Sequence, residues 1–339
     1  MNDTTANERL PRGVRLLHAL QQEPDLSTMT AAEFAAYCEA TTRKYGSPLI
    51  RSITGFPDRG AEIRWQDLTL ADRAVRVRVY RPASARDTGA ALPLVLHVHG
   101  GGFVGTASQC DWGNAHLAAR LPALVVSVEH RLLTPETPLA DAVADAWDVL
   151  RHLLAHATEW GFDPARIAVA GESAGGLIAA LIAIRAKAAG LPLRAQVLIN
   201  PACDLTDTMY DYPSMTRHAY DVPRLRMFRR LAVPSGTDPR ALSPLHADLG
   251  GLAAALVVVP TVDPLADHGR GYAERLRESG TPARLTEYPG APHAFITLPR
   301  LVPQAKAARA EVTEFLRGHL PGSPAATTQP PELRRQGAR

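Results

Sequence analysis

The sequence has 339 residues, and its 37 Lys and Arg against 34 Asp and Glu give a net charge of +3. Hydrophobic residues make up 46% of the chain and charged residues 21%, a balance typical of a globular protein with a large core, which excludes global disorder. The sequence lacks a run of about 18 apolar residues, which excludes a membrane-spanning helix. The small net charge, without a basic stripe, argues against nucleic acid as a partner.

Cysteine usage and the N-terminus bear on metal binding and location. Three cysteines lie far apart and form no C-x-x-C pair, which indicates neither a disulfide framework nor a zinc site; they are Cys38, Cys110 and Cys203. We therefore expect reduced, structural thiols and no metal. The polar N-terminus has no apolar segment of the kind that directs secretion, which predicts a cytoplasmic protein.

The region 1–58 contains helical patterns ahead of any strand pattern. Thr30 followed by Glu33 matches a capping box, the pair of reciprocal hydrogen bonds that begins many helices. Phe34 and Tyr37 then recur at helical spacing. We interpret this region as an N-terminal helical cap, separate from the domain that follows it.

Strand patterns begin after this region and alternate with helical ones. Apolar and polar residues alternate over 62–82 around a short turn, which predicts an antiparallel hairpin with one solvent-exposed face. Apolar runs predict further strands at Leu94–Val98, Leu124–Val128, Ile167–Ala170, Val197–Ile199, Leu256–Val259 and Arg284–Tyr288. Helical patterns occupy Asn114–Arg120, Pro138–His156, Ala174–Ala189, Asp267–Ser279 and Pro303–His319. The alternation predicts an α/β fold with a mostly parallel central sheet flanked by helices.

Two segments depart from that alternation. The stretch 204–240 is rich in Pro, Tyr, Arg and Met and is too long for a plain connection, so we expect a second cap segment there. The final stretch, 321–339, has almost no large apolar residue and is expected to be a disordered tail. The predicted catalytic domain therefore spans 59–320 and carries the second cap segment as an insertion.

The motif Gly171-Glu172-Ser173-Ala174-Gly175 fits the pattern G-x-S-x-G. It follows an apolar run and precedes a helical one, which is the strand–turn–helix setting of a nucleophile elbow. Small residues suit a tight turn with a strained serine, and a helix N-terminus favours developing negative charge. A chance glycine-rich turn is the alternative and fits this setting less well. The motif predicts Ser173 as a nucleophile.

The run H-G-G-G-F at 99–103 directly follows a predicted strand. Glycines let backbone N–H groups line a concavity, and acyl transfer needs such donors because its tetrahedral intermediate carries a negative oxygen. A phosphate-binding loop is the alternative, but the glycine spacing matches neither common phosphate motif. We therefore expect an oxyanion hole at Gly100, Gly101 and Gly102, with the Gly101, Gly102 and Ala174 amides as donors.

A serine nucleophile needs a base, and the base needs an acid that orients it. In folds with this elbow the chain order is nucleophile, acid, histidine. Asp263 follows the predicted strand at 256–259, and His293 follows the predicted strand at 284–288. Both positions lie at carboxyl ends of strands, where open α/β sheets place their sites, so we predict Asp263 as acid and His293 as base.

Each of these assignments has rivals in the sequence. Asp267 lies where a helix begins, so N-capping explains it, and His268 beside it is expected on the surface. The remaining histidines are interpreted as structural, with His99 anchoring the glycine loop.

Four motifs occur in a specific order: HGGGF at 99–103, GESAGG at 171–176, DPLAD at 263–267 and PGAPHAF at 289–295. Together they resemble the hormone-sensitive-lipase-like branch of the α/β-hydrolases, also called bacterial esterase family IV. The resemblance covers roughly residues 60–318. It implies an α/β-hydrolase core with a cap made from the N-terminal helices and the insertion near 204–240. It also implies the roles of nucleophile, acid and base for Ser173, Asp263 and His293.

The activity implied by the resemblance is hydrolysis of short, medium or specialised carboxylic esters through an acyl-enzyme, without metal or cofactor. A small-molecule ester would then be the partner, and members of the family often form homodimers. Two other classes stay open. One is an acyltransferase, thioesterase or lactone hydrolase that uses the same triad. The other is a non-catalytic small-molecule receptor, against which the presence of His293 argues.

Substrate contacts are expected from aromatic residues of the cap and of the glycine loop, namely Phe34, Tyr37, Phe103, Tyr210 and Tyr212. The chain departs from the family pattern at 129–136, and at His97 and Asn200, where members often carry an aromatic residue. These departures leave the predicted triad and oxyanion loop intact. They bear on the identity of the substrate more than on the chemistry.

Overall fold

The computed structural model describes most of the chain, namely residues 10–15, 24–26, 28–85, 89–218 and 222–321. The tail expected at 321–339 lies outside the described residues except for Pro321. Within the described ranges, no helix combines the length and apolar character needed to cross a bilayer.

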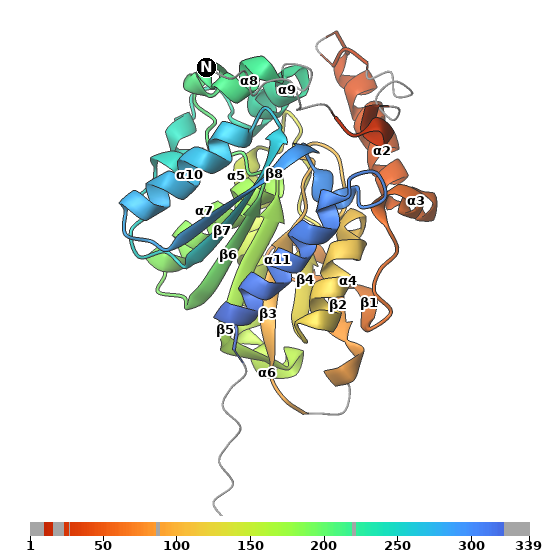
Figure 1. Ribbon diagram of the computed structural model, residues 1–339, viewed down its shortest axis with the longest axis vertical. Coiled ribbons are helices and arrows are strands. Elements are labelled where there is room, and N and C mark those ends of the chain that lie inside the picture. The colour runs from red at the N-terminus through yellow and green to blue at the C-terminus, as the bar shows by residue number, and fades with distance from the viewer. Residues whose placement is uncertain (1–9, 16–23, 27, 86–88, 219–221, 322–339) are drawn as a thin grey trace, which may run out of the picture.

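The centre of the fold is one sheet (Figure 1). Its strands are β1 (Ala61–Thr69), β2 (Ala74–Pro82), β3 (Leu92–Val98), β4 (Leu124–Val128), β5 (Phe162–Glu172), β6 (Leu193–Ile199), β7 (Ala254–Val262) and β8 (Ala283–Pro292). They lie side by side in the order β1-β2-β4-β3-β5-β6-β7-β8. The contacts β1–β2 and β2–β4 are antiparallel, and all other neighbours run parallel. The predicted hairpin and the mostly parallel sheet are confirmed.

Local sequence explains the two kinds of strand. β3 is buried along its whole length, as a continuous apolar run requires in a parallel sheet covered on both faces. β2 instead buries its valines, whereas its other face exposes Arg76 but largely covers Arg78, which pairs with the buried Asp111 at 2.9 Å. Both guanidinium groups stack over Trp65 of β1, at 4.5 and 4.8 Å from the ring centroid. Tyr80 on that face is also fully buried, so the solvent-exposed face that the alternation predicts is limited to the part of the hairpin near Arg76.

Helices cover both faces of the sheet (Figure 1). They are α2 (Ala31–Gly46), α3 (Arg51–Thr54), α4 (Asp111–Arg120), α5 (Leu139–Ala155), α6 (Ala157–Trp160), α7 (Ala174–Ala188), α8 (Pro213–Arg217), α9 (Val222–Ala232), α10 (Ala266–Glu278) and α11 (Gln304–His319). One apolar cluster joins α4 and α11 to the sheet through Trp112, Leu117, Val312 and Leu316. A second cluster, on the other face, joins α5, α7 and α10 through Trp147, Leu150, Leu177, Ile178 and Tyr272.

Two segments far apart in the chain contact the loop that follows β3. Helix α2 starts with the predicted capping box, and its Phe34 packs on Phe103 with ring centroids 5.5 Å apart. From α9, the Phe228 ring approaches Gly102 so closely that a Cβ there would lie 2.5 Å from it. In Figure 1, α2, α8 and α9 lie at the same end of the molecule, beyond the tips of the central strands. Both segments therefore border the glycine loop.

Candidate active site

Ser173 lies in the tight turn between the end of β5 and the start of α7. Its φ of 56° is positive, a strained conformation that the surrounding turn must hold in place. A Cβ at Gly171 would lie 2.3 Å from the Gly175 carbonyl oxygen, and one at Gly175 would lie 2.1 Å from the Val98 oxygen. Glycine is therefore required at both positions, and the turn directs the serine side chain away from the sheet as a nucleophile elbow does.

The structure brings Ser173, His293 and Asp263 together in one chain of hydrogen bonds. Ser173 Oγ lies 2.8 Å from His293 Nε2, and His293 Nδ1 lies 2.8 Å from Asp263 Oδ2. Asp263 directly follows β7 and His293 directly follows β8, so all three side chains stand at carboxyl ends of parallel strands. This order allows the imidazole to take the hydroxyl proton while the carboxylate holds the other ring nitrogen.

Exposure differs among the three groups in a way that suits this chemistry. Asp263 is fully buried, and its second carboxylate oxygen accepts a hydrogen bond from the Leu265 amide at 2.7 Å. The His293 side chain is 22% exposed, so solvent and small molecules can reach the imidazole. The buried carboxylate is therefore fixed, while the reacting end of the chain stays accessible.

The rivals of these residues have other partners. Asp267 does not cap α10. Its carboxylate accepts a hydrogen bond from the Ser214 amide at 2.8 Å and pairs with Arg270 at 2.7 Å. The prediction that His268 lies on the surface is wrong, because His268 is fully buried. The start of α10 packs under the segment that includes Tyr212, and the ring centroids of the two residues are 5.0 Å apart. Burial lowers the pKa of His268 to about 4.

The glycine loop has the backbone that an oxyanion hole needs. Gly101 and Gly102 have φ of 111° and 66°, and a Cβ at Gly101 would lie 2.0 Å from the Val104 oxygen. In the described part of the chain, the amides of Gly101, Gly102 and Ala174 donate no hydrogen bond to other protein groups. The Gly100 amide, which was not among the expected donors, donates to Glu172 Oε1 at 3.1 Å. Three amides therefore remain available to a ligand.

His99 anchors this loop, as the sequence predicts. Its Nδ1 donates to the Gly100 carbonyl oxygen at 2.9 Å, and its ring stacks on His130 with centroids 4.2 Å apart. Burial lowers the pKa of His99 well below its usual range, with the neighbouring His130 adding to the effect. His99 therefore stays neutral and holds the backbone of the glycine loop in place, rather than transferring protons.

The five aromatic residues expected to contact substrate fall into two groups. Phe34, Tyr37 and Phe103 lie together beside the glycine loop, where Arg224 stacks over the Phe103 ring at 5.2 Å. Tyr210 lies under Arg226, and the Tyr212 hydroxyl donates to Asp204 at 3.1 Å. The first group borders the site, whereas the two tyrosines of the second group have partners within the insertion.

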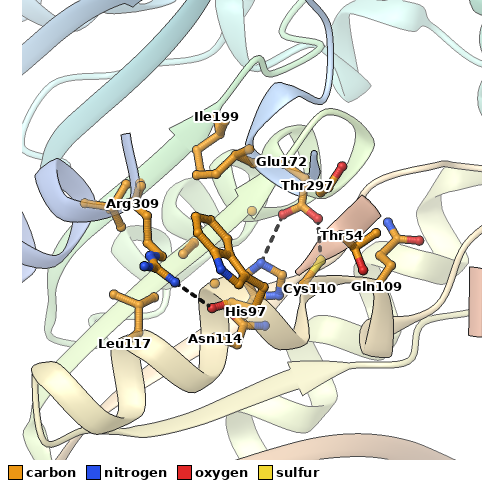
Figure 2. A pocket seen from close by; sticks show the side chains of 17 residues that line it. Thr54, His97, Gln109, Cys110, Asn114, Leu117, Glu172, Ile199, Thr297 and Arg309 are labelled. Carbon is orange, nitrogen blue, oxygen red and sulfur yellow. Dashed lines mark hydrogen bonds and ion pairs between the residues drawn. The ribbon is translucent and has the colours of Figure 1, made fainter. Parts of the chain in front are cut away.

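A cavity of about 50 Å³ lies behind the elbow, between the sheet and helices α4 and α11. Figure 2 shows His97 and Cys110 directed at Glu172 on one side of it, with Ile199, Leu117 and Arg309 around the rest. Sequence reasoning missed this group, since it treated Cys110 as a plain core thiol and His97 as a departure from a family pattern. A histidine inside an apolar strand was the available signal.

The same group raises the question of a metal. Among the described residues, His97, Cys110 and Glu172 offer ligand atoms that all lie within 4.8 Å of one another. Each side chain already hydrogen-bonds within the group, with His97 Nε2 at 3.0 Å and Cys110 Sγ at 2.7 Å from the Glu172 carboxylate. These bonds account for the three residues without a cation, and we assign no metal to them.

Comparison with known proteins places the chain in a family. A family model described as an α/β-hydrolase fold matches residues 95–297. The chain belongs to this family, in its hormone-sensitive-lipase-like branch.

Individual relatives agree with that placement. The carboxylesterase NlhH of Mycobacterium tuberculosis is 36% identical over 82% of this chain and 87% of its own length. The ethyl acetate hydrolase of Pseudomonas putida is 32% identical over 75% of this chain and 82% of its own.

Solved structures show the same fold. The hyperthermophilic esterase of Pyrobaculum calidifontis superposes with a TM-score of 0.81 and 29% identity, covering 91% of this chain and 98% of that one. The thermostable carboxylesterase EstE1, cloned from a metagenomic library, gives a TM-score of 0.77 and 31% identity over 87% of this chain and 100% of its own.

Proposed function

We propose that this protein is a serine carboxylesterase that cleaves carboxylic ester bonds through an acyl-enzyme. The observation that carries the proposal is the pair of 2.8 Å hydrogen bonds that link Ser173 to His293 and His293 to Asp263. Sequence similarity to proteins named as carboxylesterase and as ethyl acetate hydrolase supports the same class of reaction.

In the first half of the reaction, Ser173 Oγ attacks the carbonyl carbon of the ester while His293 Nε2 takes the hydroxyl proton. Asp263 holds the ring in the tautomer that leaves Nε2 free to accept, and stabilises the imidazolium that forms. The ester C–O bond then breaks, and His293 returns the proton to the departing alcohol. The acyl group stays on Ser173.

The amides of Gly101, Gly102 and Ala174 stabilise the negative oxygen of the tetrahedral intermediate. They are preorganised, because the positive φ of the loop glycines and the start of α7 aim them before substrate arrives. Loss of one such donor typically lowers turnover by about 10²–10³-fold. The position of Ser173 at the start of α7 adds the favourable end of the helix dipole.

In the second half, water replaces the alcohol. His293 takes a proton from the water molecule as it attacks the acyl carbonyl carbon, and returns that proton to Ser173 Oγ when the acyl bond breaks. A carboxylic acid leaves, and the hydroxyl of Ser173 is restored. Every step uses side chains and amides of this chain alone.

The substrate is a small-molecule ester with a short or medium acyl group, or a more specialised one. Phe34, Tyr37 and Phe103 beside the glycine loop form the apolar surface proposed to contact it. A cytoplasmic location, a homodimer and the division into a cap region (1–58 and 204–240) and a catalytic domain (59–320) stay predictions, and the chemistry depends on none of them.

The test is hydrolysis of nitrophenyl esters of rising acyl length, from acetate to laurate, with Ser173→Ala as the matched variant. We expect turnover that peaks at short or medium chains and falls by roughly 10³-fold or more in Ser173→Ala. Added alcohol that competes with water for the acyl group would shift the assignment toward an acyltransferase. Hydrolysis of these esters by Ser173→Ala at the wild-type rate would refute the proposal.

A further inference from the structure

Glu172 directly precedes the nucleophile and has no part in the mechanism above. Its side chain is only 4% exposed, although the residue ends a strand beside the candidate active site. Its carboxylate accepts three hydrogen bonds: from His97 Nε2 at 3.0 Å, from the Cys110 thiol at 2.7 Å and from the Gly100 amide at 3.1 Å. Burying a carboxylate costs considerable desolvation free energy, which its hydrogen bonds must offset. We therefore ask what these three contacts do.

Two neighbouring strands orient His97, the first of these donors. His97 of β3 stands opposite Ser127 of β4 in the parallel register, and His97 Nδ1 lies 2.9 Å from Ser127 Oγ. Because an ionised carboxylate can only accept, His97 Nε2 carries a proton and donates it to Glu172, while Nδ1 shares a hydrogen bond with the serine hydroxyl. The ring is therefore held at both nitrogens and aims one N–H at Glu172.

The Glu172 carboxylate is ionised and the thiol is not. Burial alone would raise the pKa of Glu172, but the His97 ring and the hydrogen bonds from Cys110 and Gly100 lower it below its usual range. Burial and the adjacent carboxylate raise the pKa of Cys110 well above its ordinary value. Cys110 therefore acts as a hydrogen-bond donor rather than as a reactive thiolate.

Hydrogen bonds, rather than packing, keep this carboxylate in place. The cavity of about 50 Å³ borders His97, Cys110 and Glu172, so one side of the group is not close-packed (Figure 2). Of its three bonds, the one to Gly100 reaches the first glycine of the oxyanion loop. The carboxylate thus links the elbow that carries Ser173 to the loop that carries two oxyanion donors.

We propose that Glu172 is a positioning residue that clamps the oxyanion loop to the nucleophile elbow, with His97 and Cys110 holding its carboxylate against Gly100. The proposal rests on the serine esterase function above and extends it. Gly101 and Gly102 directly follow the clamped residue, so their amides keep their aim only while Gly100 is held. Displaced donors would weaken transition-state binding more than substrate binding, because the oxyanion exists only after attack.

The first test is Glu172→Gln, which keeps the shape of the side chain but turns one acceptor into a donor. We expect kcat on a nitrophenyl ester to fall about tenfold to hundredfold, with KM within about twofold. Affinity for a trifluoromethyl ketone, which forms a tetrahedral adduct, should fall by the same factor as kcat/KM.

A second pair of variants keeps the test decisive if Glu172→Gln does not fold. Cys110→Ala removes one donor from the carboxylate and should lower kcat about threefold to tenfold at unchanged KM. Cys110→Ser restores a donor and should return kcat to within about twofold of wild type. The matched control is Cys203→Ala, which removes an equally buried thiol that is not part of this group and should leave kcat unchanged.

The outcomes separate the two proposals. Folded Glu172→Gln or Cys110→Ala with wild-type kcat and wild-type ketone affinity would overturn the clamp, and so would a rise in KM at constant kcat. Equal losses in Cys110→Ala and Cys110→Ser would also overturn it, since a general packing defect would then suffice. If any of these contrary outcomes is found while Ser173→Ala abolishes turnover, only the proposed role of Glu172 is refuted. Wild-type turnover by Ser173→Ala would refute the proposed function itself.

Discussion

At the scale of single residues, the two aspartates that follow β7, one in the loop and one in the first turn of α10, differ in the partner that each contacts. Asp263 bonds to the His293 imidazole at 2.8 Å, whereas Asp267 bonds to Ser214 and Arg270. The two carboxylates lie only four residues apart in the chain, so they form a matched pair for mutation. Sequence order alone favoured Asp263 because Asp267 lies at the start of a helix.

We predict that Asp263→Asn lowers kcat by about 10³–10⁴-fold with little change in KM, because the amide stabilises the wrong imidazole tautomer. Steady-state kinetics on a short nitrophenyl ester measures this. Asp267→Asn is the control and should keep kcat within a few-fold, although its loss of contacts lowers stability. A large loss of kcat in Asp267→Asn, with Asp263→Asn active, would reverse the assignment.

At the scale of elements, a buried ion pair ties α5 to the hairpin and to the loop after β4. Asp145 of α5 is almost fully buried and accepts from Arg73 Nε at 2.8 Å and from Arg131 Nε at 3.0 Å. It also accepts from the Arg131 amide at 2.9 Å. One carboxylate therefore bonds to donors from two other segments and links three segments of the chain.

We predict that Asp145→Ala lowers the free energy of unfolding by about 2–3 kcal/mol, since it leaves two guanidinium groups without their buried partner. The cost stays below that of a fully buried pair because Arg131 is partly exposed. Urea unfolding measures the loss. Asp148→Ala removes a more exposed partner of Arg73 and should cost less than about 1 kcal/mol. Equal costs for the two variants would contradict this account.

At the scale of the whole molecule, buried neutral histidines make stability depend on pH. His268 has its pKa lowered to about 4 by burial, whereas the unfolded chain binds that proton near the ordinary value of about 6.5. The unfolded state therefore gains protons first as pH falls, so stability declines between those two values. Carboxylates with lowered pKa, such as Glu172, contribute stability that is lost only at lower pH still.

We predict that the free energy of unfolding falls by about 3 kcal/mol from His268 alone between pH 6.5 and pH 4. Urea unfolding at a series of pH values measures the slope. In His268→Gln the decline across this window should be shallower, because the glutamine does not titrate. An identical slope in wild type and His268→Gln would show that another group controls the acid sensitivity.

The sequence predicted most of the fold because the strands are short apolar runs and the helices carry clear periodicity. It also singled out Ser173, Asp263 and His293, which the structure joins by hydrogen bonds, since each of them follows a strand. It failed where long-range packing decides, as for the burial of His268 under the segment near Tyr212. From local patterns, His268 was expected on the surface and Tyr212 was expected to contact substrate.

The group around Glu172 was missed for a related reason. Its bonding partners His97 and Cys110 are separated from it by 75 and 62 positions in the chain. No helix or strand period links such positions. Only the pairing of β3 with β5, and the turn that leads into α4, bring them together. A contact of this kind is a property of the fold rather than of any segment.

The central claim is that Ser173 becomes covalently acylated, and an organophosphate ester of nitrophenol tests it most directly. We predict one phosphoryl adduct per chain, located by mass spectrometry on the peptide that contains Ser173. Esterase activity should fall in proportion to the fraction of chains that carry the adduct. His293→Ala should label far more slowly under the same conditions. Complete inactivation with the adduct on another residue, or with none on the Ser173 peptide, would contradict the account.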